Sequence, residues 1–301
     1  MTGSAPLSTP DHADYMAARE PVLTAEHVTI DYQAERPVRA VDDVSLVLNR
    51  GEILGLAGES GCGKTTLAYG INRLLKPPAI LRSGAVTLHD KNGADIDVVG
   101  LVDEDLRKFR WDKTSMVFQG AMNALNPVLS VKAQLSDVFT THRPSMSKQE
   151  RQAASEELLS LVGVDPARLT AYPHELSGGM RQRVMIAMAL ALKPQVMIMD
   201  EPTTALDVVV QRGILREVMR LREQFNFAVI FITHDLPMLL EISDRIAVMK
   251  AGRIVEINTS ENIYERPQHD YTKQLLRSFP SLLGDRGGFV RGKEEAHVAR
   301  G

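Results

Sequence analysis

The sequence predicts an α/β fold in which helices cover a mostly parallel β-sheet. Short apolar segments with strand character, at 52–57, 196–200 and 227–235, alternate with helical segments along the chain. Strands that are connected through helices usually run parallel in one sheet. A glycine-rich loop links the first of these segments to a helix, and an acidic pair ends the second. Because α/β proteins bind ligands at the carboxyl edge of such a sheet, both features predict a ligand site there.

Composition bounds the class of protein. A chain of 301 residues suggests two folded units at about 150 residues each. The 35 basic and 38 acidic residues give a net charge of −3, which excludes the overall basic footprint of a nucleic-acid binder. A single cysteine excludes an internal disulfide framework and any four-cysteine metal centre. No apolar run is long enough to cross a bilayer and no secretory signal is evident, so we expect a cytosolic soluble chain.

The first half of the chain contains predicted strands and one clear helix. Alternating apolar residues predict strands at 22–32 and 41–49, and 85–90 has the same character. A continuous apolar run predicts a buried strand at 52–57. The helix after the glycine-rich loop is predicted to run through Leu75.

The second half is predicted to be helical first and then alternating. Residues 119–193 carry little strand character, and Ser147 followed three positions later by Glu150 is a helix-start pattern. A helix over Val208–Gln224 and a hairpin at 246–256 accompany the two apolar strands already noted. The helical middle is therefore interpreted as an insertion into the sheet.

These patterns predict three segments. Residues 1–21 form a flexible extension, 22–258 form the main domain with a helical part at about 120–190, and 259–301 form a C-terminal tail. The end of the tail is rich in glycine and charge.

Residues Gly58 to Thr65 match the phosphate-binding loop pattern G-x4-G-K-[ST]. Backbone N–H groups of such a loop cradle phosphates, the lysine reaches the β- and γ-phosphates, and the threonine hydroxyl binds Mg²⁺. The alternative, a purely structural glycine turn, is disfavoured because the loop joins a strand to a helix. The predicted ATP-binding residues are Gly58, Glu59, Ser60, Gly61, Cys62, Gly63, Lys64, Thr65 and Thr66.

An acidic pair follows the apolar strand at 196–200. Asp200 suits a place beside Mg²⁺, and Glu201 suits a general base that activates the attacking water. Adjacent acids at a strand end can also be a solvated turn. The phosphate-binding loop upstream favours the functional interpretation.

A second helix start also has the chemistry to bind phosphate. Ser177 can cap the helix that follows, and the amides of Gly178 and Gly179 can hold an anion. A plain helix cap is the alternative. The chain thus has two helix starts that can bind phosphate but only one phosphate-binding loop with a lysine. The helix start at Ser177 has a role if it binds a nucleotide that is held by another chain.

With these motifs in order, residues 22 to 280 resemble the ATP-binding subunits of ABC transporters. The resemblance implies a P-loop NTPase (RecA-like) core with an antiparallel β subdomain and an inserted α-helical subdomain. It also implies that Gln119 senses Mg²⁺ and the γ-phosphate, that Asp207 communicates across a dimer, and that His234 contacts the γ-phosphate. Tyr32 would stack on adenine, although a strand-surface tyrosine is the alternative.

Narrower features are similar to the ATPases of dipeptide, oligopeptide and nickel importers. Met180, where most relatives carry glutamine, resembles the first of two unlike ATPases. The resemblance implies a second ATPase partner, two membrane permeases and an extracytoplasmic substrate-binding protein, with this chain on the cytoplasmic face of the membrane. Related systems also import oligosaccharides, so the cargo is predicted only as peptides or oligosaccharides.

Three departures from that subgroup limit what carries over. Gly120 and Ala121 replace an acidic-proline pair where permeases dock, and Asp270 replaces a tail proline. The cysteine cluster of many relatives is missing, so ATP and Mg²⁺ are expected without an iron–sulfur cluster. Two rivals stay open: a soluble ABC-type ATPase that is not coupled to transport, and an ATP-binding regulator without turnover.

Overall fold

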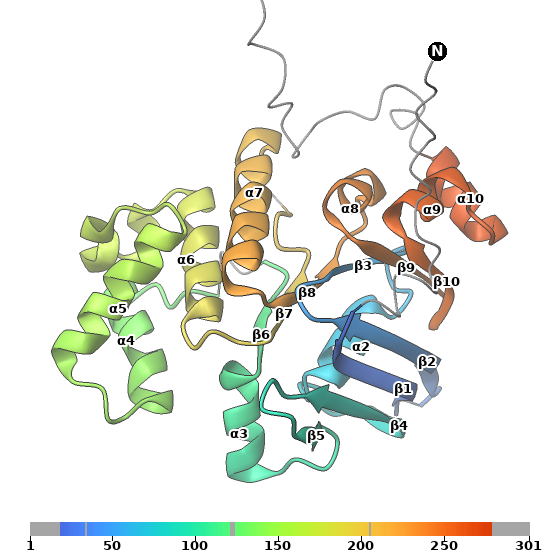
Figure 1. The fold of residues 1–301 in the computed structure, drawn as a ribbon, viewed down its shortest axis with the longest axis horizontal. Helices are drawn as coiled ribbons and strands as arrows, with labels where there is room; N and C mark the ends of the chain where they lie inside the picture. The colour runs from blue at the N-terminus through green and yellow to red at the C-terminus, as the bar shows by residue number, and fades with distance from the viewer. Residues whose placement is uncertain (1–18, 34, 121–123, 205, 279–301) are drawn as a thin grey trace, which may run out of the picture.

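Two β-sheets form the framework of this computed structural model (Figure 1). It describes residues 19–33, 35–120, 124–204 and 206–278. The strands are β1 (Pro21–Tyr32), β2 (Val38–Asn49), β3 (Ile53–Ala57), β4 (Ala79–His89), β5 (Asp95–Asp97), β6 (Thr114–Val117), β7 (Val196–Asp200), β8 (Ala228–Ile232), β9 (Arg245–Lys250) and β10 (Arg253–Thr259).

The larger sheet confirms the predicted parallel core. Its six strands run in the order β10-β9-β3-β8-β7-β6. Strand β3 pairs in parallel with β8 and β9, while β7 pairs in parallel with β6 and β8. Every residue of β3, β7 and β8 is buried, which explains why these strands are continuous apolar runs in the sequence. Only β10 is antiparallel, because it forms the predicted hairpin with β9.

The smaller sheet is the antiparallel β subdomain that the family resemblance implied. Its order is β2-β1-β4-β5, and every pairing in it is antiparallel. The two sheets lie next to each other around α2, as Figure 1 shows.

Helices surround the sheets and build a separate arm. They are α2 (Lys64–Ile71), α3 (Asp103–Asp112), α4 (Val131–His142), α5 (Lys148–Leu161), α6 (Gly178–Leu190), α7 (Val208–Phe225), α8 (Leu236–Ile242), α9 (Ser260–Glu265) and α10 (Asp270–Arg277), with short 3-10 turns η2 (Pro166–Thr170) and η3 (Pro173–Glu175). Helices α4, α5 and α6 gather on one side of the molecule in Figure 1. Among the described residues, no helix combines the length and apolarity needed to cross a bilayer.

Several local predictions are confirmed and two differ. Ser147 and Glu150 form the reciprocal capping box that starts α5. Helix α2 ends at Ile71 rather than at Leu75, since Arg73 has a left-handed backbone with φ of 56° that a helix cannot continue through. Strand β10 ends at Thr259 and so runs across the predicted boundary between residues 258 and 259. Most of the predicted extension at 1–21, and residues 279–301 of the tail, lie outside the described residues.

The parallel order brings four chain segments to one edge of the large sheet. The carboxyl end of β3 continues into the phosphate-binding loop, and that of β7 ends at Asp200. Strand β8 leads to His234, and β6 leads to Gln119. The predicted site residues of these four segments therefore share one edge.

A buried ion pair lies at the opposite edge of the large sheet, at the amino ends of β3 and β9. We expect its contribution to stability to depend on pH. Nη1 of Arg245 lies 3.0 Å from Oε1 of Glu52, with side chains 2% and 0% exposed. Burial raises the pKa of Glu52, and the charge of Arg245 partly offsets that rise. Arg245→Met should lower the free energy of unfolding by about 3–5 kcal/mol near neutral pH, because the carboxylate is left buried without its partner.

Urea denaturation of the full chain measures this loss. The pKa of Glu52 is higher in the folded chain than in the unfolded chain, so ionised Glu52 lowers the stability of the fold. The loss of stability caused by Arg245→Met should therefore become smaller as pH falls through the raised pKa of Glu52. The double variant Glu52→Gln with Arg245→Met should recover most of the stability. A single variant as stable as wild type at neutral pH would contradict this account.

Candidate nucleotide-binding site

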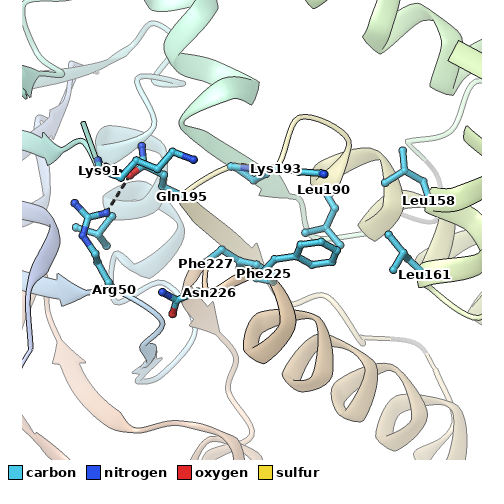
Figure 2. Close-up of a pocket in the computed structure, with 12 residues that line it drawn as sticks. Arg50, Lys91, Leu158, Leu161, Leu190, Lys193, Gln195, Phe225, Asn226 and Phe227 are labelled. Atoms are coloured by element: carbon cyan, nitrogen blue, oxygen red, sulfur yellow. Dashed lines mark hydrogen bonds between the residues drawn. The ribbon is translucent and has the colours of Figure 1, made fainter. Parts of the chain in front are cut away.

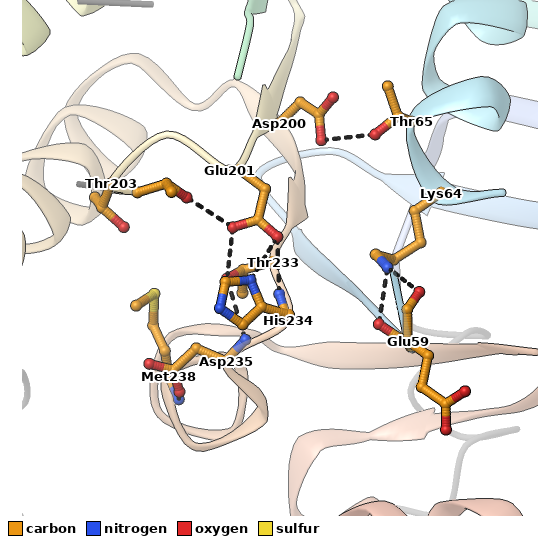
Figure 3. Close-up of polar contacts among 12 residues, drawn as sticks. Glu59, Lys64, Thr65, Asp200, Glu201, Thr203, Thr233, His234, Asp235 and Met238 are labelled. Atoms are coloured by element: carbon orange, nitrogen blue, oxygen red, sulfur yellow. Dashed lines mark hydrogen bonds and ion pairs between the residues drawn. The ribbon is translucent and has the colours of Figure 1, made fainter. Parts of the chain in front are cut away.

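The phosphate-binding loop leaves β3 and enters α2 with its lysine folded inward. Nζ of Lys64 donates hydrogen bonds to the carbonyl oxygens of Gly58 at 2.8 Å and Glu59 at 2.9 Å. Figure 3 shows these bonds at the entrance to the loop. Gly63 has a φ of 107°, and a Cβ there would lie 2.2 Å from the carbonyl oxygen of Ala40. The glycine is therefore required by both backbone conformation and space.

Thr65 and Asp200 meet across the site, as Figure 3 shows. The hydroxyl of Thr65 donates to Oδ1 of Asp200 at 3.1 Å. Oδ2 of Asp200 is buried and has no hydrogen-bond partner within the described part of the chain. Burial raises the pKa of this carboxyl, and the hydrogen bond from Thr65 partly offsets the rise. A buried, half-satisfied carboxylate beside a threonine hydroxyl fits a divalent cation.

Glu201 and His234 form a second polar pair at the same edge (Figure 3). Oε1 of Glu201 lies 2.8 Å from Nδ1 of His234 and accepts from the backbone N–H of His234 at 3.1 Å. The hydroxyl of Thr204 donates to Oε2 at 2.9 Å. Glu201 has a left-handed φ of 48°, which is uncommon for a residue with a side chain and is found preferentially at functional sites.

The other residues predicted to contact the nucleotide are half-buried or exposed to solvent. Tyr32, at the end of β1, is half-buried, and its hydroxyl lies 3.3 Å from that of Thr66. Gln119 follows β6 and is exposed. Gly120 is also exposed, whereas Ala121 lies outside the described residues.

The second predicted phosphate-binding helix start lies apart from the first. Ser177 is exposed, and its side chain accepts from the backbone N–H of Met180, so it caps α6. The first amides of a helix have no acceptor within the helix, so those of Gly178 and Gly179 can bind an anion. Figure 1 places α6 away from α2, with β6, β7 and β8 between them. The Ser177 segment is thus available to a nucleotide held elsewhere.

Asp207 has a local structural role in the single chain. Its Oδ1 accepts from the backbone N–H groups of Val209 at 3.1 Å and Val210 at 3.0 Å, which caps α7. These two bonds fix the start of α7. The predicted role of Asp207 across a dimer stays a prediction.

Sequence reasoning missed three residues that contact the site. Thr204 donates to Glu201, and the hydroxyl of Thr233 lies 3.5 Å from the same carboxylate. The hydroxyl of Tyr271 accepts from the backbone N–H of Glu59 at 3.1 Å. Thr233 could have been suspected because it directly precedes His234, and Thr204 because it lies three residues after Glu201. Nothing in the chain order places Tyr271 near the loop.

A pocket of about 280 Å³ lies at the other edge of the large sheet. Figure 2 shows Arg50, Gln195 and Phe227 among its lining residues, and these precede β3, β7 and β8. Since those strands are parallel, the pocket is at their amino ends and the predicted nucleotide site is at their carboxyl ends. The pocket is therefore separate from the site described above.

Comparison with known proteins shows the family to which this chain belongs. The family profile described as ABC transporter matches residues 41–204, a range that contains the phosphate-binding loop, Ser177 and Glu201. The chain belongs to the ABC transporter family. It is an ATP-binding, ATP-hydrolysing subunit of that family, as the sequence predicted.

Individual relatives align with more of the chain than the family profile does. A Brucella abortus protein whose name assigns it to peptide import is 41% identical, over 94% of this chain and 85% of its own length. The dipeptide transport ATP-binding protein DppD of Bacillus subtilis is 43% identical, over 87% of this chain and 78% of its own. The dimeric ATP-binding cassette MJ0796, solved in a post-hydrolysis state with ADP and Pi, superposes with a TM-score of 0.68 at 31% identity, over 79% of this chain and 98% of that one.

Proposed function

We propose that this chain hydrolyses ATP to energise the import of peptides through partner permeases. The observation that carries the proposal is the assembly of two pairs, Thr65 with Asp200 and Glu201 with His234, at the edge where the lysine loop ends. The names of the similar proteins from Brucella abortus and Bacillus subtilis support peptides as the cargo class.

Each side chain of the site has a defined task in phosphoryl transfer. Loop amides and Lys64 bind the β- and γ-phosphates of ATP. Glu201 orients and deprotonates the water that attacks the γ-phosphorus in line, and His234 contacts the γ-phosphate. His234 and Thr204 hold the Glu201 carboxylate through hydrogen bonds. The base must therefore share or release these bonds when water and the γ-phosphate arrive.

Mg²⁺ fits beside Thr65 and Asp200, and the family resemblance adds Gln119 as a further ligand. Oδ2 of Asp200 has no hydrogen-bond partner among the residues that the structure describes, and this observation favours a cation there. When bound, Mg²⁺ neutralises charge on the phosphate oxygens. Asp200 contributes a buried negative charge, and Thr65 contributes a hydroxyl oxygen close to it.

The assembly proposed has two ATPase chains, two permeases and an extracytoplasmic binding protein. Helix α6, which Ser177 caps, lies away from α2 in Figure 1, so we propose that Ser177 completes the site of a facing ATPase. Met180 belongs to the segment Leu176–Met180, which we call the signature, and its identity favours a partner of different sequence. The chain would then sit on the cytoplasmic face of the membrane, held by the permeases.

Purification of the tagged chain from its native membranes tests this function. Integral membrane proteins should co-purify with it, and the reconstituted complex should release phosphate faster when binding protein and peptide are added. Recovery without any membrane protein would favour the soluble ATPase. Complexes that bind ATP and release no phosphate would favour a regulator.

We also expect the chain to contain no iron–sulfur cluster. Cys62 is the single cysteine, is buried, and lies inside the phosphate-binding loop, whereas such clusters are held by several cysteine thiolates. Anaerobically purified protein should show neither cluster absorbance nor stoichiometric iron. Four iron atoms per purified chain with a charge-transfer band would contradict this expectation.

A further inference from the structure

The C-terminal helix α10 contacts the phosphate-binding loop through one tyrosine. Tyr271 is 3% exposed, and its hydroxyl accepts a hydrogen bond from the backbone N–H of Glu59 at 3.1 Å. The ammonium of Lys250, at the end of β9, lies 4.7 Å from the centre of the Tyr271 ring, within the range of a cation–π contact. The ring is thus held between β9 and the start of the loop.

Three hydrogen bonds fix where α10 begins and so where Tyr271 lies. The carboxylate of Glu256, in β10, accepts from the backbone N–H groups of Gln268 at 2.8 Å and His269 at 2.9 Å. Nδ1 of His269 then accepts from the backbone N–H of Tyr271 at 3.1 Å and caps the helix. The tail is therefore tied to the large sheet immediately before the tyrosine.

Tyr271 and Lys64 bind the two ends of one peptide group. The N–H of Glu59 and the carbonyl of Gly58 belong to the same planar unit. The N–H end donates to Tyr271, and the carbonyl end accepts from Nζ of Lys64 at 2.8 Å. Gly58 has a φ of 148°, and as a glycine it restricts rotation of this peptide less than other residues would. The tyrosine hydroxyl supplies the restriction that the glycine lacks.

The back of the loop is also closely packed against the hairpin before the tail. A Cβ on Gly58 would lie 2.2 Å from the carbonyl oxygen of Met249, in β9. The N–H of Gly252 donates to the carbonyl oxygen of Cys62 at 3.0 Å. The hydrogen bond to Cys62 limits movement of the loop relative to the hairpin. The Gly58–Glu59 peptide is connected to the tail through Tyr271.

We propose that Tyr271 is a positioning residue for nucleotide binding, which fixes the Gly58–Glu59 peptide and so presents Lys64 to the phosphates. Through it, the placement of the tail sets the affinity of the phosphate-binding loop for ATP. This inference rests on the ATP site assigned above. Tyr271 itself touches neither ATP nor water in this account.

Preorganisation gives the expected direction and size of the effect. A loop that is already ordered loses less entropy when a ligand binds. Loss of one hydrogen bond of ordinary strength should weaken nucleotide binding by about 3- to 10-fold. Burial raises the pKa of Tyr271, so the hydroxyl stays neutral near physiological pH.

Tyr271→Phe tests the proposal, because it removes the hydroxyl and keeps the ring beside Lys250. In the full chain, the Kd for ADP and for a non-hydrolysable ATP analogue should rise by about 3- to 10-fold. In the assembled transporter KM should rise while kcat at saturating ATP stays within about two-fold, since the residue acts on binding alone. Amide exchange should quicken over residues 58–60 and change little elsewhere. Lys273→Ala, on the same helix and away from the loop, should behave as wild type.

Any of the following results would contradict the positioning role of the Tyr271 hydroxyl. Wild-type Kd values in Tyr271→Phe would show that the bond does not set affinity. A lower melting temperature with faster exchange across the whole chain would assign Tyr271 to packing. A fall in kcat with KM unchanged would place it in the chemical step. Wild-type protein that binds no nucleotide would overturn the assigned site together with this inference.

Discussion

Glu201→Gln should retain ATP binding and lose about 10²- to 10⁴-fold in the rate of hydrolysis, the usual contribution of a positioned general base. The variant keeps the size of the side chain and an oxygen that can accept from the backbone N–H of His234. It loses the ability to take a proton from water. ATP should therefore accumulate in the bound state, and the closed arrangement of two ATPase chains should become stable enough to isolate.

Steady-state phosphate release and equilibrium ATP binding, both on the assembled transporter, separate the two effects. Glu223→Gln is a matched control, because it makes the same change on a carboxyl that is 69% exposed on α7. Its turnover should equal that of wild type. Turnover of Glu201→Gln within two-fold of wild type would move the general base to another group.

Mixing the variants Lys64→Ala and Ser177→Arg should restore no lost activity if the partner ATPase is a different chain. Lys64→Ala removes the cation that binds phosphates on this chain's own loop. Ser177→Arg places a bulky charge on the exposed start of α6, which in the proposed assembly faces the nucleotide on the partner. Lys64→Ala should reduce turnover by orders of magnitude at the site on this chain's own loop, and Ser177→Arg should do the same at the site on the partner's loop, since each change removes an essential phosphate contact.

The outcome of mixing depends on which chains face each other. In a dimer of two copies, the loop of the Ser177→Arg chain would meet the signature of the Lys64→Ala chain, and one site would be intact. In a pair of unlike chains each complex holds one copy of this chain, so mixing creates no new combination and the activity stays that of the separate variants. Clear rescue in complexes without a second ATPase would refute the unlike pair and leave the ATPase assignment in place.

Two controls make this experiment decisive. Ser147→Arg removes the equivalent helix cap from α5, and loss of a cap costs about 1 kcal/mol of stability. The ATPase activity of Ser147→Arg should persist. This result would show that the effect of Ser177→Arg does not come from the loss of a helix cap alone. A covalently linked dimer with one intact site establishes whether one site supports measurable turnover.

Local chemistry was sufficient to predict the motif-bearing parts of the fold. The strands β3, β7 and β8 are continuous apolar runs because a parallel sheet covered on both faces buries every residue. Ser147 and Glu150 predicted the start of α5 because a capping box is complete within four neighbouring positions. Helix α3 was not predicted: its only buried residue is Phe109, so it presents no apolar face from which a helix could be recognised.

The sequence by itself determined the family, the fold class and the identity of the residues at the carboxyl edge, because each depends on short-range patterns. Only the tertiary structure decided how those residues pair. Glu201 bonds to His234 and Thr65 to Asp200 because the strand order β3-β8-β7 places separate strand ends side by side. The contact between Tyr271 and the phosphate-binding loop likewise exists only after the hairpin β9-β10 folds back on β3. Pairings between residues far apart along the chain leave no periodic signal, so the physical reason for this division is the range of the interaction.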